Sequence, residues 1–344
     1  MSDIEIYQNE HPCLESYWRS IILFGKNVAS YKFALGKSLL ELAEKQQTII
    51  TLEELAVPYS KHICEHIANA PRQATSNSSK FLEKCKEYNE GKIRVQELYD
   101  ITVERGFNNV IDAFHVVNRD SIQVEFFTKN YKRGSKKIIL TDEIFGLQEN
   151  HNKENIYQEV ESRWNLVEKA WELGISRNLL DVKYDDEKKI FFVNQDLKRK
   201  DVTTARSALS GYQKGKCFYC FGDISVEKGS EELCDVDHFY PHTLKKTMLG
   251  VNIDGVWNLV LACPHCNRGE NGKFERIPER KYLQRLYKRN EFLISSHHPL
   301  RETIMNQTGG TSQKRREFLE KIDRTAIESL AHRWKTENRG EEVF

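Results

Sequence analysis

Three short stretches decide the fold of the C-terminal part of this chain: GKCFYC at residues 215–220, CDVDHFYPH at 234–242 and WNLVLACPHCNR at 257–268. The first and the third each contain a Cys-x-x-Cys pair. Two thiolates spaced in this way on a tight turn point in the same direction, and four sulfurs complete the tetrahedral shell that structural zinc prefers. The spacing therefore predicts a structural Zn²⁺ site made by Cys217, Cys220, Cys263 and Cys266.

The chain contains eight cysteines, and five of them lie between Cys217 and Cys266. Such clustering in a chain that is expected to be cytoplasmic indicates a metal site rather than disulfides. The fifth member of the cluster, Cys234, is expected to be a packed thiol beside the neighbouring strand.

The second stretch supplies the residue types of a hydrolytic centre. Residues 233–238 are predicted to form a short strand that ends in the pair Asp237-His238, and Asn267 directly follows the last cysteine, where a helix can begin. A zinc ion at the cysteines would fix the distance between the strand and the helix. An Asp oxygen from one element and an Asn oxygen from another suit a hard divalent cation with open positions for water and phosphate.

These motifs together resemble the HNH nucleases, also called His-Me finger or ββα-metal nucleases. The resemblance covers residues 211–275 and rests on Asp237-His238, Asn258, Asn267 and the two cysteine pairs. The chain reads His-Asn-Asn at the pattern positions, a variation found in the family. The segment 243–254 is an insertion relative to the family pattern.

The resemblance implies a role for each matched residue. His238 would be the general base that deprotonates the attacking water, which suits its ordinary pKa of ~6.5. Asp237 and Asn267 would hold one divalent ion, expected to be Mg²⁺, that neutralises charge on the scissile phosphate. Asn258 would fix the loop that orients His238. The expected products carry a 5′-phosphate and a 3′-hydroxyl.

The role of His242 stays open at this point. It is interpreted as an exposed turn histidine, as a substrate contact or as an auxiliary metal ligand, since histidine is the commonest metal-ligating side chain.

A run of cations follows the motif. Residues 268–289 hold eight Lys and Arg against three Glu, although the whole chain has a net charge of only +1. A local excess of this kind is typical of a surface that binds phosphates, and a solvated helix face is the ordinary alternative. The residues nearest the motif are the expected nucleic-acid contacts: Arg268, Lys273, Arg276, Arg280 and Lys281.

The N-terminal part is predicted to be mainly helical. Apolar residues at helical spacing predict two helices, or one bent helix, over 13–46, and a further helix over 159–173. Thr51 and Glu54 have the spacing of a capping box, which predicts a short helix there, followed by another that begins at Pro58.

The remaining patterns predict two β-hairpins and a domain boundary. The hairpins are expected within residues 122–140 and 180–193, and the polar run 194–204 is expected to be the linker. The fold class is therefore α+β. The expected domains are a helical accessory or regulatory domain at 1–198 and a zinc-containing nuclease domain at 199–344 with C-terminal helices.

Three functions compete on these grounds. The favoured one is a metal-dependent DNA endonuclease that serves as a bacterial restriction or anti-phage defence effector. The alternatives are a nuclease that acts on RNA and a non-catalytic zinc-ribbon module that binds nucleic acid. Residues 1–198 are expected to bind a protein partner or to self-associate. Without a signal sequence or an apolar run of the ~18 residues that a membrane span needs, a cytoplasmic location is expected.

Overall fold

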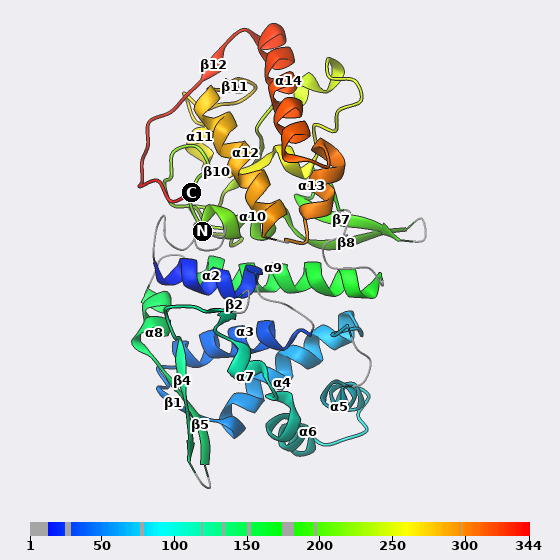
Figure 1. The fold of residues 1–344 in the computed structure, drawn as a ribbon, viewed down its shortest axis with the longest axis vertical. Helices are drawn as coiled ribbons and strands as arrows, with labels where there is room; N and C mark the ends of the chain where they lie inside the picture. The colour runs from blue at the N-terminus through cyan, green and yellow to red at the C-terminus, as the bar shows by residue number, and fades with distance from the viewer. Residues whose placement is uncertain are drawn as a thin grey trace. The chain divides into compact units, whose positions relative to one another are not determined.

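The structure is a computed structural model that describes residues 13–24, 29–75, 79–117, 120–132, 135–149, 153–173, 182–195, 198–296 and 298–344. It divides the chain into two compact units, Pro12–Ile175 and Ser176–Phe344, each with its own core. Helices and small sheets occur in both units, so the fold class is α+β, as the sequence predicts (Figure 1). Among the described residues, no helix is long and apolar enough to span a membrane.

The N-terminal unit is built mainly from helices. Its elements are α2 (Leu14–Phe24), α3 (Tyr31–Glu44), β1 (Ile49–Thr51), α4 (Leu52–Asn69), α5 (Lys80–Asn89), α6 (Val95–Ile101), the π-helix η1 (Thr102–Gly106), α7 (Val110–Ala113), β2 (Val116–Val117), β3 (Asp120–Ser121), β4 (Phe127–Lys132), β5 (Ser135–Leu140), α8 (Asp142–Glu149) and α9 (Lys153–Glu172). The first predicted hairpin is confirmed as β4 and β5, and β1 adds to its free edge in the order β1-β5-β4.

Helix α4 corrects one prediction and confirms another. The capping box is present, because the Thr51 side chain accepts from the Glu54 backbone while the Glu54 carboxylate accepts from the Thr51 backbone. The predicted break at Pro58 is wrong, since α4 continues through it to Asn69. Proline removes one helical hydrogen bond. The buried face that includes Tyr59 and Ile63 runs on past that point and keeps the helix in place.

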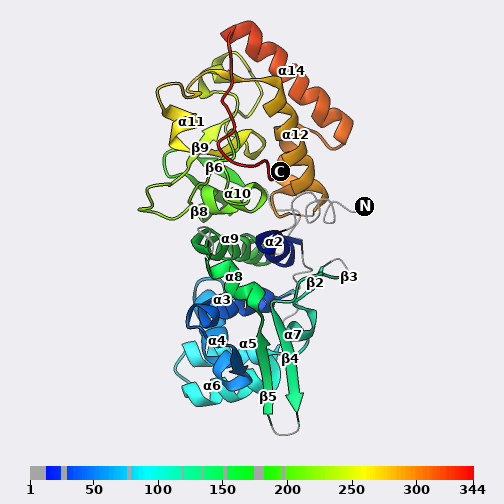
Figure 2. The ribbon, with the colours of Figure 1, turned by 90° about the vertical axis from the view of Figure 1, so that its left-hand side faces the viewer.

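The C-terminal unit combines small sheets with a group of long helices. Its elements are β6 (Lys183–Asp185), β7 (Ile190–Gln195), β8 (Lys198–Thr204), α10 (Ala205–Gln213), β9 (Asp235–His238), the 3-10 helices η2 (His242–Lys246) and η3 (Val256–Asn258), β10 (Leu259–Ala262), α11 (Pro264–Arg268), β11 (Ile277–Pro278), α12 (Arg280–Ser295), α13 (Arg301–Thr308), α14 (Ser312–Leu330) and β12 (Arg333–Trp334). Strands β9 and β10 form a two-stranded hairpin, helix α10 packs on both strands, and α11 packs on β9. Helices α10 and α11 and strand β9 are labelled in Figure 2.

The boundary between the units lies earlier than the sequence suggests. The polar run expected to be a linker contains strand β8, which pairs antiparallel with β7, and β6 completes a sheet in the order β6-β7-β8. This sheet packs against α10, and the Val182 amide donates to the Thr303 hydroxyl at 2.9 Å. The residues from Val182 onward therefore belong with the C-terminal unit and not with the helical one.

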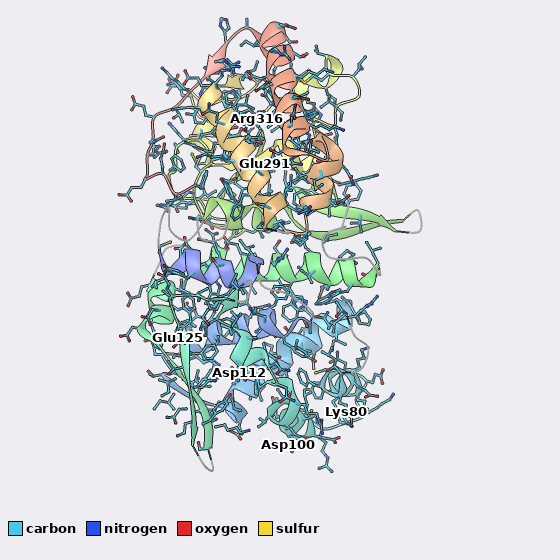
Figure 3. All side chains as sticks on the ribbon, in the orientation of Figure 1. Lys80, Asp100, Asp112, Glu125, Glu291 and Arg316 are labelled. Carbon is cyan, nitrogen blue, oxygen red and sulfur yellow. The ribbon has the colours of Figure 1, made fainter. Side chains whose placement is uncertain are left out.

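Buried and paired arginines fix the long C-terminal helices. On α12, the Arg289 guanidinium donates to the carbonyls of Trp257 and Leu259 at 3.2 and 2.9 Å. Complete burial lowers the pKa of Arg289 to about 10. Glu291 of α12, labelled in Figure 3, accepts two bonds from Arg315 of α14 at 2.6 and 2.7 Å. These contacts hold α12 against both the hairpin loop and α14.

Candidate active site and metal centre

The four predicted zinc ligands come together in a buried cluster. Their Sγ atoms all lie within 4.8 Å of one another. The Cys220 and Cys263 sulfurs are 3.8 Å apart. Tetrahedral zinc with Zn–S bonds of ~2.3 Å places neighbouring sulfurs ~3.8 Å apart. The four side chains thus fit a tetrahedral metal ion, and the cluster can bind a metal such as zinc.

Backbone amides around the cluster donate to its sulfurs. The amides of Gly222 and Cys266 lie 3.4 Å from the sulfurs of Cys220 and Cys263, and the Cys263 amide lies 3.3 Å from the sulfur of Cys217. Amides aimed at sulfur stabilise the thiolate form, which is the form that binds a metal ion. The turn that carries the first pair needs Phe221 at a positive φ of 59°, so the chain accepts local strain to shape this cluster.

The cluster is anchored to the second strand of the central hairpin. The Phe218 amide donates to the Leu261 carbonyl at 2.9 Å. The Gln213 side chain bonds both the amide and the carbonyl of Leu261 at 2.8 Å. A metal ion bound by the cysteines would therefore hold the start of α11 and the strand β10 in one arrangement.

The hairpin brings the predicted catalytic residues to one end. Strand β9 pairs antiparallel with β10, with His238 opposite Leu259 and Asp237 opposite Val260, and α11 begins two residues after β10. This order of two antiparallel strands and a helix is the ββα order that the sequence analysis expects. Because side chains alternate along a strand, Asp235 and Asp237 lie on one face of β9 and His238 lies on the other.

Asp237 is buried and already paired. One carboxylate oxygen accepts from the Tyr219 hydroxyl at 2.6 Å, and the other lies 3.2 Å from the Lys273 ammonium. Burial raises the pKa of Asp237, and Lys273 and Tyr219 only partly offset that effect.

Asn267 lies beside a different aspartate. Its side-chain amide donates to Asp235 at 3.1 Å, and Arg268 donates to the same carboxylate oxygen at 2.8 Å. The two expected ion ligands, Asp237 and Asn267, do not contact a common group in the structure. Asp237 contacts Tyr219 and Lys273, whereas Asn267 contacts Asp235. For Asp237 to bind a cation, its carboxylate would have to exchange the contact with Lys273 for the ion.

His238 lies at the end of β9 with its side chain only 10% exposed. Its Nε2 atom is 3.3 Å from Asp254 Oδ1, and its Nδ1 atom is 3.9 Å from Asp186 in the turn between β6 and β7. The ring of Tyr184 stands edge-on to it at 6.0 Å. Within the described part of the chain, His238 Nε2 has no hydrogen-bond partner of good geometry. In the tautomer that carries its proton on Nδ1, Nε2 can take a proton or bind a ligand.

Asn258 holds the turn that follows His238. Its side chain accepts from the Tyr240 amide at 2.9 Å and donates to the carbonyls of Tyr240 and Ile253 at 3.0 and 2.9 Å. Its own carbonyl accepts from the Phe239 amide at 2.7 Å. This buried amide positions the backbone on both sides of the hairpin end.

The predicted nucleic-acid contacts separate into two groups. Arg268, Arg276, Arg280 and Lys281 are exposed, whereas Lys273 is completely buried against Asp237. Lys273 therefore has an internal position in place of the surface position that the sequence suggests.

The exposed cations continue into a groove between α12 and α14. The groove has a volume of about 610 Å³, and the residues that line it include Arg280, Tyr287, Lys288 and Arg316. The Arg316 guanidinium stacks over the Tyr287 ring at 5.2 Å, and Arg316 is labelled on α14 in Figure 3.

Comparisons with known proteins do not identify a relative that shares this site. No family model, no curated protein and no solved structure matches the chain. The assignment to the HNH nucleases thus stays a prediction from the motifs.

Three residues near the centre are not indicated by the motifs, namely Tyr219, Asp235 and Asp254. Tyr219 lies between the first pair of cysteines, where it reads as a spacer, and Asp254 lies at the end of the insertion. Asp235 carried a usable signal, because a carboxylate two positions before Asp237 on a strand points to the same face. Asp254 carried none, since its place depends on the path of the insertion.

Proposed function

We propose that the chain is a nuclease of the HNH type that hydrolyses phosphodiester bonds of DNA. The observation that supports it most is the position of His238 at the end of a ββα arrangement, with a buried Nε2 atom that lacks a hydrogen-bond partner among the described residues. A non-catalytic zinc ribbon that binds nucleic acid requires the four cysteines, but its binding does not require a buried histidine nitrogen without a hydrogen-bond partner.

His238 acts as the general base in this proposal. Nε2 takes the proton of the attacking water, and the ring becomes an imidazolium. The Asp254 carboxylate, 3.3 Å away, stabilises that positive charge. The contact with His238, aided by Lys245 and His242, holds the pKa of Asp254 below its ordinary value, so the carboxylate is charged when the base works.

The proposal keeps the structural zinc ion at the four cysteines and a requirement for a divalent ion such as Mg²⁺. The cysteine cluster fits its ion. The second expectation, Mg²⁺ at Asp237 and Asn267, stays a prediction, and we assign no chemical step to an ion there, because Asp237 contacts Tyr219 and Lys273 while Asn267 contacts Asp235.

DNA is the proposed substrate because cations and an aromatic ring line the groove between α12 and α14. Arg280, Lys288 and Arg316 suit phosphate contacts, and the Arg316–Tyr287 stack keeps one guanidinium extended on the surface. RNA offers the same phosphates and is the alternative substrate. We propose further that the enzyme serves in restriction or anti-phage defence in the cytoplasm, with the N-terminal unit as the regulatory part that binds a partner or a second copy.

A substrate comparison tests the proposal. The purified full chain is incubated with supercoiled plasmid DNA or structured RNA, with Mg²⁺ or with EDTA. We expect plasmid cleavage that needs the divalent ion and yields ends with a 5′-phosphate and a 3′-hydroxyl. Cleavage of RNA alone would support the alternative nuclease, and binding of both without cleavage of either would support the non-catalytic module.

A further inference from the structure

Three potential metal ligands converge beside the end of β9. They are His238 at the end of the strand, His242 in the first position of η2 and Asp254 in the loop before η3. One ligand atom from each lies within 4.8 Å of those of the other two. We propose that these three side chains form a second metal site, which binds a transition-metal ion such as Zn²⁺.

The distances among the ligand atoms match a metal shell. Asp254 Oδ1 is 3.0 Å from His242 Nδ1 and 3.3 Å from His238 Nε2. Metal bonds to nitrogen and oxygen of ~2.0–2.2 Å place neighbouring ligand atoms ~3.3–3.6 Å apart in a tetrahedral shell and ~2.8–3.1 Å apart in an octahedral one. The longer measured distance fits the first arrangement and the shorter one fits the second.

Two of these ligand atoms make no hydrogen bond within the described part of the chain. His238 Nε2 and Asp254 Oδ1 are buried, face each other and lack hydrogen-bond partners of good geometry. A buried donor or acceptor without a partner is unfavourable, because it has lost its hydrogen bonds to water. An ion bound between the two atoms would remove that cost for both at once.

The surrounding groups leave the site open to an ion. Lys245 bonds the other oxygen of Asp254, Oδ2, at 2.8 Å, so Oδ1 remains a monodentate ligand. Asp186 lies 3.9 Å from His238 Nδ1 and favours the proton on that nitrogen, which leaves the Nε2 lone pair for the metal. His242 is 52% exposed, so an ion can enter from solvent and keep an open position for water.

The ligand set indicates which ion binds. Two imidazoles and one carboxylate are the ligands of zinc and related transition metals, whereas Mg²⁺ prefers oxygen ligands only. The site is distinct from the four-cysteine cluster in its residues and in its chemistry.

An ion at this site has a consequence that rests on the proposed function. His238 Nε2 cannot accept a proton from water while it binds a metal ion. Occupation of the site by Zn²⁺ therefore switches off the general base, and excess Zn²⁺ inhibits cleavage.

Metal titration tests the site without any use of activity. The full chain is dialysed to remove loosely held metal, its zinc content is measured, and Zn²⁺ is titrated by calorimetry into wild type and three variants: His242→Ala, Asp254→Asn and His265→Ala. His265 is the matched control, because it is an exposed histidine between the two cysteines of the second pair. Wild type and His265→Ala should bind one Zn²⁺ beyond the retained one. The two ligand variants should bind it at least ~10-fold more weakly, because even partners outside the metal shell change affinity ~10–100-fold.

Equal Zn²⁺ affinity in all four proteins, or no additional ion in wild type, overturns the proposal. Co²⁺ gives a second view, because nitrogen and oxygen ligands yield visible bands without the intense thiolate charge-transfer band. A thiolate band from the additional ion also overturns the site. The ratio of cleavage rates with and without Zn²⁺ is then compared within each protein, and His242→Ala should be less inhibited than wild type. A chain that binds the second ion yet cleaves no DNA contradicts the proposed function and leaves the site standing.

Discussion

Asp237 and Lys273 form a buried ion pair in the C-terminal unit. The Lys273 side chain is completely buried and also donates to the Phe274 carbonyl at 3.1 Å. Each charge depends on the other, because a lone buried charge is strongly unfavourable. The pair thus links the strand that carries His238 to the segment after α11.

Removal of one partner should be costly. Lys273→Ala leaves Asp237 buried without its cation, and we expect a loss of about 3–5 kcal/mol in the free energy of unfolding. Urea unfolding followed by circular dichroism measures this loss. Lys281→Ala removes an exposed lysine of α12 as the control. If the two variants unfold at the same urea concentration, the pair has no such role.

A charged cluster in the N-terminal unit responds to pH. His66 stacks on Trp164, and its ring nitrogens lie 2.9 Å from Glu168 and 3.3 Å from Glu161. Burial lowers the pKa of His66, but the two carboxylates more than offset this, so the pKa is raised. Burial acts in the opposite sense on Glu161, and His66 and Lys37 lower the pKa of that carboxyl to about 2.

The signs of these shifts define a pH window. The His66 contribution is complete below its unfolded pKa of ~6.5 and is lost as the pH rises through the higher folded value. The Glu161 contribution is complete above ~4.3 and is lost as the pH falls towards 2. We expect the difference in unfolding free energy between wild type and His66→Gln to shrink from about pH 6 to pH 9. Denaturant unfolding at several pH values measures it, and a constant difference would contradict this view.

At the scale of elements, the cysteine cluster joins β10, α11 and the loop of the first cysteine pair. Structural zinc in small domains contributes apparent binding free energies of ~10–16 kcal/mol, which are then available for folding. Helix α11 has only five residues, and its side chains Asn267 and Arg268 also bond Asp235 of β9. The ion should therefore determine whether the ββα arrangement persists.

Loss of one ligand tests this dependence. Cys220→Ser should reduce the zinc content from one ion to none and speed amide hydrogen exchange in β9 and β10. Cys234→Ala is the matched control, because Cys234 is buried near the hairpin but lies outside the cluster. Full zinc content in Cys220→Ser, or loss of zinc from Cys234→Ala, would show that the ligand set is different.

The proposed role of the groove between α12 and α14 in DNA binding gives a separate prediction. Arg316→Glu removes one phosphate contact, so we expect weaker DNA binding and a salt dependence that is shallower by about 0.9 in the logarithmic slope. Lys321→Glu, on the same helix but outside the groove, is the control. Fluorescence anisotropy at several salt concentrations measures both. Equal effects of the two changes would place the DNA elsewhere.

For the whole molecule, the sequence predicts local features well and long-range ones poorly. The capping box at Thr51 is confirmed because its two residues are close together in the chain. The cluster of the two cysteine pairs is confirmed although the pairs are far apart, because their spacing and residue type predict four ligands of one ion. The polar run 194–204 predicts a linker, but it contains strand β8, because polar residues on both faces give no strand signal and the pairing with β7 depends on three-dimensional contacts. Asp254 could not be predicted as a neighbour of His238, because no periodic sequence pattern predicts the path of the inserted segment 243–254.

The function itself rests on what His238 does. The most direct measurement is the single-turnover rate of plasmid cleavage by His238→Ala in Mg²⁺, with His265→Ala as the control and the circular dichroism spectrum as the check that the fold is intact. A general base contributes a factor of ~10²–10⁴, so His238→Ala should be slower than wild type by that factor while it still binds DNA. A rate equal to that of His265→Ala would contradict the account.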